Sequence, residues 1–449
     1  MLNRFFKLAE NGTTVGREIQ AGLTTFAAMA YILAVNPDIL SATGMDRGAL
    51  VTATACGAAL STILMALLTN YPLALAPGMG INAYFTYSVC IGMGVPWQGA
   101  LAMVFVNGVT FLALSLTGIR ERIVNAIPYQ LKIAITCGIG LFIAFIGLKN
   151  AGIVVSHPAT FVTHGDLGAP GPLLALGGIL LMLTLVARRV PGAIVVTIFV
   201  IAVAGLFVSD GQGARITPLP DQVVGRPASI APIALELDFS YILNDVWAAI
   251  PVILTLLFVD MFDNIGTLIG VTQRAGFLGK DGKLPRIGPA LVADSTAAIA
   301  SSLLGTSTVV SYIESASGVE AGGRTGLTAI TVALLFLAAL FFSPLILAIP
   351  SVATAPALVV VGVFMMQSAR ELNLQDFPLA APAILTIFLM PLTFSISTGI
   401  GVGLITAVVL MAVAGRSAET TKITLILAGV FVLEFLRTPI SAAIRWLLG

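Results

Sequence analysis

The sequence is a succession of apolar runs, most of them long enough to cross a bilayer as a helix. They cover, roughly, residues 18–36, 49–69, 76–92, 98–117, 131–148, 172–188 and 192–209, and then 247–270, 287–304, 306–319, 326–343, 353–367, 379–394 and 396–414. Charged residues make up 10% of the 449 positions, against about 25% in soluble proteins. We therefore predict an all-α polytopic membrane protein.

Several other classes of protein are disfavoured. The formal net charge is +1 and no basic tract is present, so nucleic acid is not an expected partner. Cys56, Cys90 and Cys137 lie in apolar runs without metal-type spacing. No nucleophile–base set is visible either. We expect no metal, no cofactor and no enzymatic activity. An ion channel would need a continuous polar pore with charged rings, and the isolated acids and paired interrupted runs described below argue against one.

The positions of Lys and Arg in the short connections predict the orientation. If the N-terminus is cytoplasmic, Arg120, Arg122, Lys280 and Lys283 fall on the cytoplasmic side, and the polar segment 210–245 falls outside. The second set of seven runs then starts on the opposite side from the first. Such an inverted repeat is common in transporters of the cell membrane, with the site at the midplane between the repeats. A last run, residues 421–440, is an extra span or an interfacial helix.

The eighth run carries two carboxylates near its middle, Asp260 and Asp263. Three residues of spacing place them on one side of a helix. A central acid costs roughly 2.5–3.5 kcal/mol on an insertion scale. We therefore expect these acids to face a wet cavity, a partner or a substrate. The alternative is an acid near a helix end or paired with a base, and the nearest downstream base is Arg274.

The third run of each set is short and interrupted. Residues 75–85 read LAPGMGINAYF, and residues 305–315 read GTSTVVSYIES. Thr, Ser and Val favour extended backbone over helix. Each run is therefore predicted to be a short strand followed by a half-helix whose N-terminus points at the midplane. Asn82 and Glu314 would lie near these two ends, as ligand contacts or as helix caps.

Five segments resemble a known family over nearly the whole chain. They are GLTTFAAMAYILAVNP (22–37), PLALAPGMGINAYFTYSV (72–89), FVDMFDNIGTLIGVTQRAG (258–276), ADSTAAIASSLLGTSTVVSYIESASGV (293–319) and GGRTGLTAI (322–330). They closely resemble the AzgA-like purine permeases of the nucleobase/ascorbate transporter superfamily, which transport hypoxanthine, guanine or adenine, generally with protons. The substrate implied for this chain is a purine nucleobase.

The resemblance also implies an architecture, that of the uracil permease. It predicts fourteen spans in a 7+7 inverted repeat, with short strands in the broken spans 3 and 10. Residues 1–128 and 247–344 would form a core domain, residues 129–246 and 345–415 a gate domain, and residues 416–449 an extra C-terminal helix. Related folds often form homodimers, although no residue of this sequence indicates one. A sulfate or bicarbonate carrier of the same broad fold would prefer a basic or neutral site, whereas the candidate site of this chain is acidic.

The resemblance assigns site residues. Asp263 matches the family's acid in span eight, and Glu314 matches its Glu in span ten. Asp260 aligns with the substrate-binding Glu of the uracil permease, but some purine permeases of this family carry no acid there, so it ranks below Asp263. Asn264 stands where the uracil permease has a His, so that residue's protonation role is not carried over. Candidates for stacking on the purine ring, or for ordinary packing, are Phe85, Tyr84, Phe262 and Tyr312.

The chemistry of a purine suits these residues. An oxopurine offers ring N–H donors to a carboxylate, and a carbonyl that Asn82 or half-helix N–H groups would bind. We expect Glu314 to hold a purine N–H, and Asp263 or Asp260 to carry a coupling proton. The predicted function is purine import by proton symport, with hypoxanthine and guanine favoured because the DMFDNIGTL segment is nearer that type. Adenine as the substrate and Na⁺ coupling remain alternatives.

Overall fold

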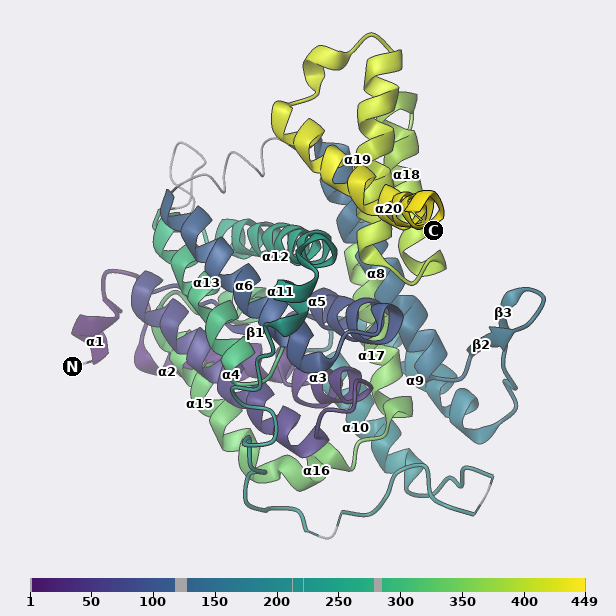
Figure 1. Ribbon diagram of the computed structural model, residues 1–449. Coiled ribbons are helices and arrows are strands. Elements are labelled where there is room, and N and C mark those ends of the chain that lie inside the picture. Colours follow the sequence, from purple (N-terminus) through teal and green to yellow (C-terminus); the bar gives the residue numbers. More distant parts are fainter. Residues whose placement is uncertain (1, 118–126, 212, 221, 278–284, 449) are drawn as a thin grey trace.

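The computed structural model describes residues 2–117, 127–211, 213–220, 222–277 and 285–448 (Figure 1). Arg120, Arg122, Lys280 and Lys283, on which the predicted orientation depends in part, lie outside these ranges. The described chain is almost entirely helical, and eight of its helical stretches are long and apolar enough to cross a membrane, with shorter apolar helices between them. The predicted all-α polytopic fold class is confirmed.

The uninterrupted runs of the first set form single helices, except that the first run is divided in two. They are α2 (Val15–Met29), α3 (Ile32–Ser41), α4 (Arg47–Thr69), α6 (Trp97–Thr117), α8 (Tyr129–Asn150), α9 (Pro170–Ala187) and α10 (Ala193–Gly205). Local signals explain the ends of α4: the side chain of Asp46 accepts from the N–H of Ala49 at 2.7 Å, and Asn70 takes up a left-handed conformation after the last turn.

The second set follows the same pattern. Its helices are α12 (Val246–Arg274), α13 (Ile287–Leu303), α15 (Gly326–Ala339), α17 (Ser351–Met366), α18 (Phe377–Leu392) and α19 (Ile396–Val413). Short helices connect or precede them: α1 (Leu2–Phe5), α11 (Ser240–Asn244) and α16 (Ser343–Leu347). The last predicted run is one helix, α20 (Lys422–Leu448), which packs against α19 and α12.

The two interrupted runs meet at their strands. In the first set, β1 (Leu75–Pro77) leads into α5 (Met79–Ala83) and then into a π-helix, residues 84–92. In the second set, β4 (Val309–Ser311) precedes α14 (Ser315–Glu320). The strands pair antiparallel, with Leu75 opposite Ser311 and Pro77 opposite Val309, and all six residues are buried. The predicted strand-then-helix form of both runs is confirmed, and pairing satisfies backbone groups that lipid could not.

The helices gather into two bundles that lie side by side (Figure 1). The crossed-helix bundle contains β1 and β4 together with α2–α6 and α12–α15; its main packing pairs are α6 with α13 and α15 with both α4 and α2. The flanking bundle contains α8–α10 and α17–α19, with α8 packed against both α17 and α18. The crossed-helix bundle draws its helices from residues 15–117 and 246–339, and the flanking bundle from residues 129–205 and 351–413. Their assignment to core and gate domains stays a prediction.

Glycines allow the closest approach inside the flanking bundle. A Cβ placed on Gly362 of α17 would lie 2.4 Å from the carbonyl oxygen of Gly140 on α8. A Cβ placed on Gly147, two turns further along α8, would lie 2.9 Å from the carbonyl oxygen of Ala355. Small residues at such a seam let two membrane helices approach closely enough for extensive van der Waals contact. The α8–α17 pair is therefore closely packed.

One element was not predicted. The connection after α8 forms a hairpin of β2 (Val154–His157) and β3 (Phe161–His164), with Val154 opposite His164. Each strand is only four residues long and mostly exposed. Such short strands leave too little alternation for periodicity to reveal them.

Candidate functional site

Asn82 lies at the crossing of the two interrupted runs. It is fully buried in the interior of α5, whose N-cap residue is Gly78, so it does not cap the helix. Its Oδ1 accepts a hydrogen bond from the Ser307 hydroxyl of the opposite run. Its Nδ2 meets no acceptor among the described residues. Because Ser307 occupies the oxygen end of the amide, the end left for a further partner is a donor.

Glu314 lies in the short connection between β4 and α14. It stands at the N-cap position of α14, but its side chain makes no capping hydrogen bond, so the capping alternative does not hold. Its Oε1 instead accepts from the hydroxyl of Tyr31 at 2.8 Å. Tyr31 lies at the interruption between α2 and α3. Tyr31 was not among the predicted site residues, although a tyrosine in the middle of an apolar run is a visible signal.

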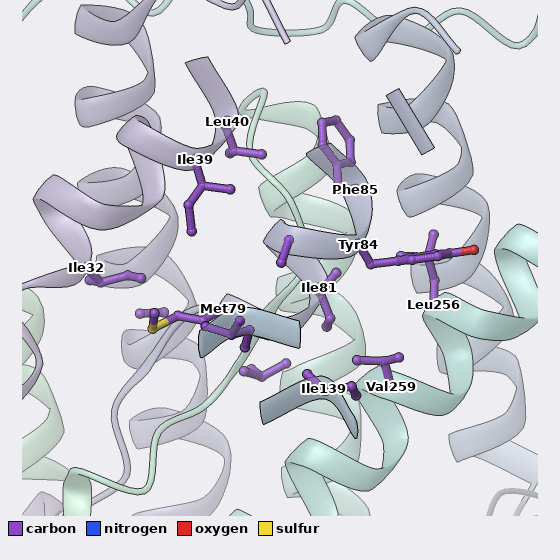
Figure 2. Packing of buried hydrophobic residues seen from close by; sticks show 14 of the residues in the cluster. Ile32, Ile39, Leu40, Met79, Ile81, Tyr84, Phe85, Ile139, Leu256 and Val259 are labelled. Carbon is purple, nitrogen blue, oxygen red and sulfur yellow. The ribbon is translucent and has the colours of Figure 1, made fainter. Parts of the chain in front are cut away.

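Asp263 lies at the boundary between the bundles. It is partly exposed and borders a cavity of about 10 Å³. The other lining residues come from both bundles: Gly80 and Val259 from the crossed-helix bundle, and Thr136, Ile139 and Met365 from the flanking bundle. Ile139 and Val259 lie next to each other in Figure 2. A cavity of this size holds about one water molecule.

Asp260 has different surroundings. It is fully buried, and its Oδ2 accepts from Nδ2 of Asn107 on α6 at 3.3 Å. Three residues of spacing separate two side chains by about 60° around a helix. That angle is enough to direct Asp260 toward α6, inside the crossed-helix bundle, while Asp263 reaches the boundary. Asn107 was not singled out from the sequence, although an amide within an apolar run marks a polar contact.

The groups near the crossing form one electrostatic cluster. Asp263 and Glu314 lie within electrostatic range of each other, and both lie within that range of the hydroxyls of Tyr31 and Tyr312. Tyr312 is also fixed by its own hydrogen bond, because its hydroxyl donates to the carbonyl of Pro77 at 2.6 Å. The structure thus brings together Asp263, Glu314 and Tyr312 of the predicted site and adds Tyr31.

The other aromatic candidates are placed less favourably. Phe85 is 2% exposed and packs within the apolar core, well away from Ile139 and Val259 (Figure 2). Tyr84 is fully buried, with its ring directed toward Leu256 of α12 (Figure 2). Phe262 belongs to α12, but its side chain lies outside the described part of the structure.

Polar contacts join the two bundles at one end of the molecule. Oδ1 and Oδ2 of Asp38 on α3 accept from the hydroxyls of Ser351 and Thr354 on α17, at 2.7 and 2.8 Å. Arg47 lies 3.5 Å from Oδ1 of Asp38 and donates to the carbonyl of Ile349 at 2.9 Å. Near the candidate site itself the boundary is apolar and tight: a Cβ on Gly80 would lie 2.7 Å from Cγ2 of Ile139.

Comparison with known proteins places the chain. The family model described as "Permease family" matches residues 16–402. The chain belongs to this permease family. Over 97% of its length it is 49% identical to "Putative permease MJ0326" of Methanocaldococcus jannaschii, covering 98% of that protein. It is 44% identical to "Guanine/hypoxanthine permease PbuG" of Bacillus subtilis, over 97% of this chain and 99% of that protein. It is 40% identical to "Adenine permease AdeQ" of Escherichia coli, over 97% and 96%.

These relatives confirm the resemblance to the purine permeases drawn from the motifs, and a permease is a transporter rather than an enzyme. Solved structures agree on the fold. The transmembrane domain of a cyanobacterium bicarbonate transporter, BicA, superposes with a TM-score of 0.65 at 17% identity, over 84% of this permease and 96% of that chain. SLC26A9 gives 0.59 at 11% identity, over 89% and 66%. At these identities the likeness concerns the fold alone, and it confirms the predicted uracil-permease-like transporter fold.

Proposed function

We propose that this permease imports purine nucleobases, with hypoxanthine and guanine favoured, by proton symport across the cell membrane, and that its N-terminus is cytoplasmic. The observation that carries the proposal is the cluster of Asp263 and Glu314 where the two bundles meet, beside the crossing that holds Asn82. The printed names of two relatives, a guanine/hypoxanthine permease and an adenine permease, support the purine class.

The donor and acceptor pattern favours an oxopurine. Glu314 provides carboxylate oxygens for a ring N–H, and charge-assisted hydrogen bonds of this kind are the stronger ones. Asn82 provides an amide N–H group, since Ser307 already occupies its oxygen. Hypoxanthine and guanine carry a carbonyl that would accept from this amide, whereas adenine offers only ring nitrogens. We therefore assign the carbonyl to Asn82 and a ring N–H to Glu314.

Asp263 is the better candidate for the coupling proton. Two neighbouring carboxylates repel each other when both are ionised, and one proton relieves the repulsion. Asp263 lies within electrostatic range of Glu314 and borders the cavity at the boundary between the bundles. Asp260 is held inside the crossed-helix bundle by Asn107. Binding the proton and the purine at adjacent groups would couple the two movements without covalent chemistry.

The proposed transport cycle moves one bundle past the other. In this proposal the crossed-helix bundle acts as the core, with residues 1–128 and 247–344, and the flanking bundle acts as the gate, with residues 129–246 and 345–415. The cavity beside Asp263, about 10 Å³, is far smaller than a purine. Admission of the substrate therefore requires the apolar contact between Gly80 and Ile139 to open. Neutralisation of Asp263 would lower the cost of moving the loaded core past the apolar gate.

Uptake of radiolabelled hypoxanthine tests the proposal. The assay uses cells that lack their own purine permeases, with unlabelled guanine, adenine, xanthine and uracil as competitors, before and after collapse of the proton gradient. We expect guanine to compete strongly, adenine weakly, and accumulation to vanish with the gradient. Competition chiefly by adenine would reverse the choice of substrate. Uptake that depends on Na⁺ alone would refute proton coupling, and absence of any purine uptake would refute the proposed function.

The Asp263→Asn variant tests the coupling site. It keeps the side-chain size but removes the titratable group. We expect it to exchange labelled for unlabelled hypoxanthine across the membrane while losing uphill accumulation. Asp260→Asn is the matched comparison and should retain at least part of the accumulation. Normal accumulation by Asp263→Asn would show that the coupling proton is held elsewhere.

A further inference from the structure

Tyr31 has a place in the fold that its burial alone does not explain. It lies between Met29, the last residue of α2, and Ile32, the first residue of α3, near the middle of the stretch Val15–Ser41 that is long enough to cross the membrane. Its side chain is 4% exposed, and it borders an apolar cavity of about 350 Å³ with residues such as Val195 and Ile198 of α10. A phenylalanine would satisfy that apolar contact equally well.

The hydroxyl group has one recorded partner among the described residues. It donates to Oε1 of Glu314 at 2.8 Å, across 283 positions of sequence. Tyr31 also lies within electrostatic range of Asp263. A buried phenol normally needs a hydrogen-bond partner, and here that partner is the carboxylate at the candidate site.

Glu314 needs such a contact to be held in one orientation. It follows a three-residue strand and precedes a six-residue helix that it does not cap. Its carboxylate is partly exposed, and the described residues supply no other side chain that hydrogen-bonds it. A glutamate has several rotatable bonds, and fixing such a side chain costs entropy at the moment of binding. A contact that fixes it beforehand removes this cost.

We propose that Tyr31 is a positioning residue for the substrate site: its hydroxyl fixes the carboxylate of Glu314 so that the remaining oxygen, Oε2, is presented to a purine N–H. The inference rests on the proposed function, because it takes Glu314 as the purine contact. Tyr31 does not itself touch the substrate. Its location between α2 and α3 ties the first span to the second interrupted run, so the site is complete only when both halves of the crossed-helix bundle are in place.

The test is the Tyr31→Phe variant, which keeps the ring and removes only the hydroxyl. We expect KM for hypoxanthine uptake to rise about tenfold, since a hydrogen bond to a charged group contributes about 1.5 kcal/mol or more. Vmax and the melting temperature of the purified protein should stay close to wild type. A merely structural role would instead lower Vmax and the melting temperature through loss of folded protein, with KM unchanged.

Tyr71→Phe is the matched control. Tyr71 is another buried tyrosine of the same bundle, 6% exposed, and its hydroxyl donates to the carbonyl of Pro285 rather than to a carboxylate. Its loss should leave KM unchanged. An unchanged KM in Tyr31→Phe, with wild-type purine uptake present, would overturn the positioning role and leave the proposed function intact. Absence of purine uptake by the wild-type protein would overturn both.

Discussion

Two glutamates, Glu18 and Glu314, lie in the same bundle and have opposite surroundings. Glu18, near the start of α2, is fully buried, and its carboxylate accepts from the N–H of Arg324 at 2.9 Å and from the hydroxyls of Thr325 and Thr328 at 2.8 and 2.7 Å. The N–H groups of Thr325 and Thr328 donate to the same carboxylate. Glu314 is partly exposed and accepts from Tyr31.

The difference lies in how far each carboxylate is satisfied by the protein. The donors around Glu18 belong to the first turn of α15 and the loop before it. The carboxylate therefore fixes the N-terminus of α15 against α2 by hydrogen bonds. A buried acid with five donors has no capacity left for a ligand. No side chain among the described residues donates to the second carboxylate oxygen of Glu314, Oε2. The two glutamates therefore differ both in exposure and in the number of protein donors, and a carboxylate with few donors keeps capacity for a ligand.

The largest effect on stability is expected from Glu18→Gln. The substitution replaces one accepting oxygen by an NH₂ group that faces other donors, and it removes the charge that strengthens every bond in the cluster. We expect a loss of about 2–4 kcal/mol of stability, seen as a lower melting temperature and a lower yield of folded protein in detergent. A melting temperature equal to that of wild type would show that Glu18 does not stabilise the contact between α2 and α15.

Asp38 is an intermediate case, because its carboxylate is satisfied by the protein but by donors of the other bundle. Its carboxylate is well supplied with donors, but Ser351 and Thr354 belong to the other bundle. Asp38→Asn should therefore weaken the contact between the bundles by about 1–2 kcal/mol, with little effect inside either one. Hydrogen–deuterium exchange at the start of α17 should accelerate, while exchange in α4 should not. Equal acceleration in both places would mean that the variant loosens the whole fold.

The smallest effect is expected where the carboxylate is exposed. Glu419 follows α19, its side chain is 52% exposed, and Nε of Arg416 donates to its Oε1 at 2.7 Å. This hydrogen bond lowers the pKa of Glu419 below its ordinary value of 4.5. Its contribution is present above that value and is lost as the pH falls through the lowered pKa. Glu419→Gln should lower the melting temperature at neutral pH by less than either variant above, and the difference from wild type should disappear in acid.

The apolar pattern predicted most of the architecture because bilayer thickness fixes the length of a span. The strand-then-helix form of the two interrupted runs also followed from local composition, since Pro and Gly interrupt the first run and Thr, Ser and Val favour extended backbone in the second. The candidate site could be predicted from the sequence in part. Asp263 and Glu314 were identified because acids in apolar runs are costly, and the resemblance to a family assigned them roles.

What could not be predicted depends on pairing between distant segments. Tyr31 and Glu314 are 283 positions apart, and Glu18 and Thr325 are 307 apart. No local pattern encodes such a contact, so the sequence could not tell the satisfied glutamate from the unsatisfied one. The same holds for Asp260 and Asp263, whose different neighbours on α6 and α8 depend on how α12 is rotated between the two bundles.

Equilibrium binding of hypoxanthine to the purified protein, compared between wild type and Glu314→Gln by calorimetry, tests the central claim most directly. We expect wild type to bind hypoxanthine, and Glu314→Gln to keep the wild-type melting temperature but to bind at least about tenfold more weakly, the equivalent of about 1.5 kcal/mol. If Glu314→Gln binds as tightly as wild type, or if its melting temperature falls as expected for Glu18→Gln, the carboxylate at the crossing is not the purine contact.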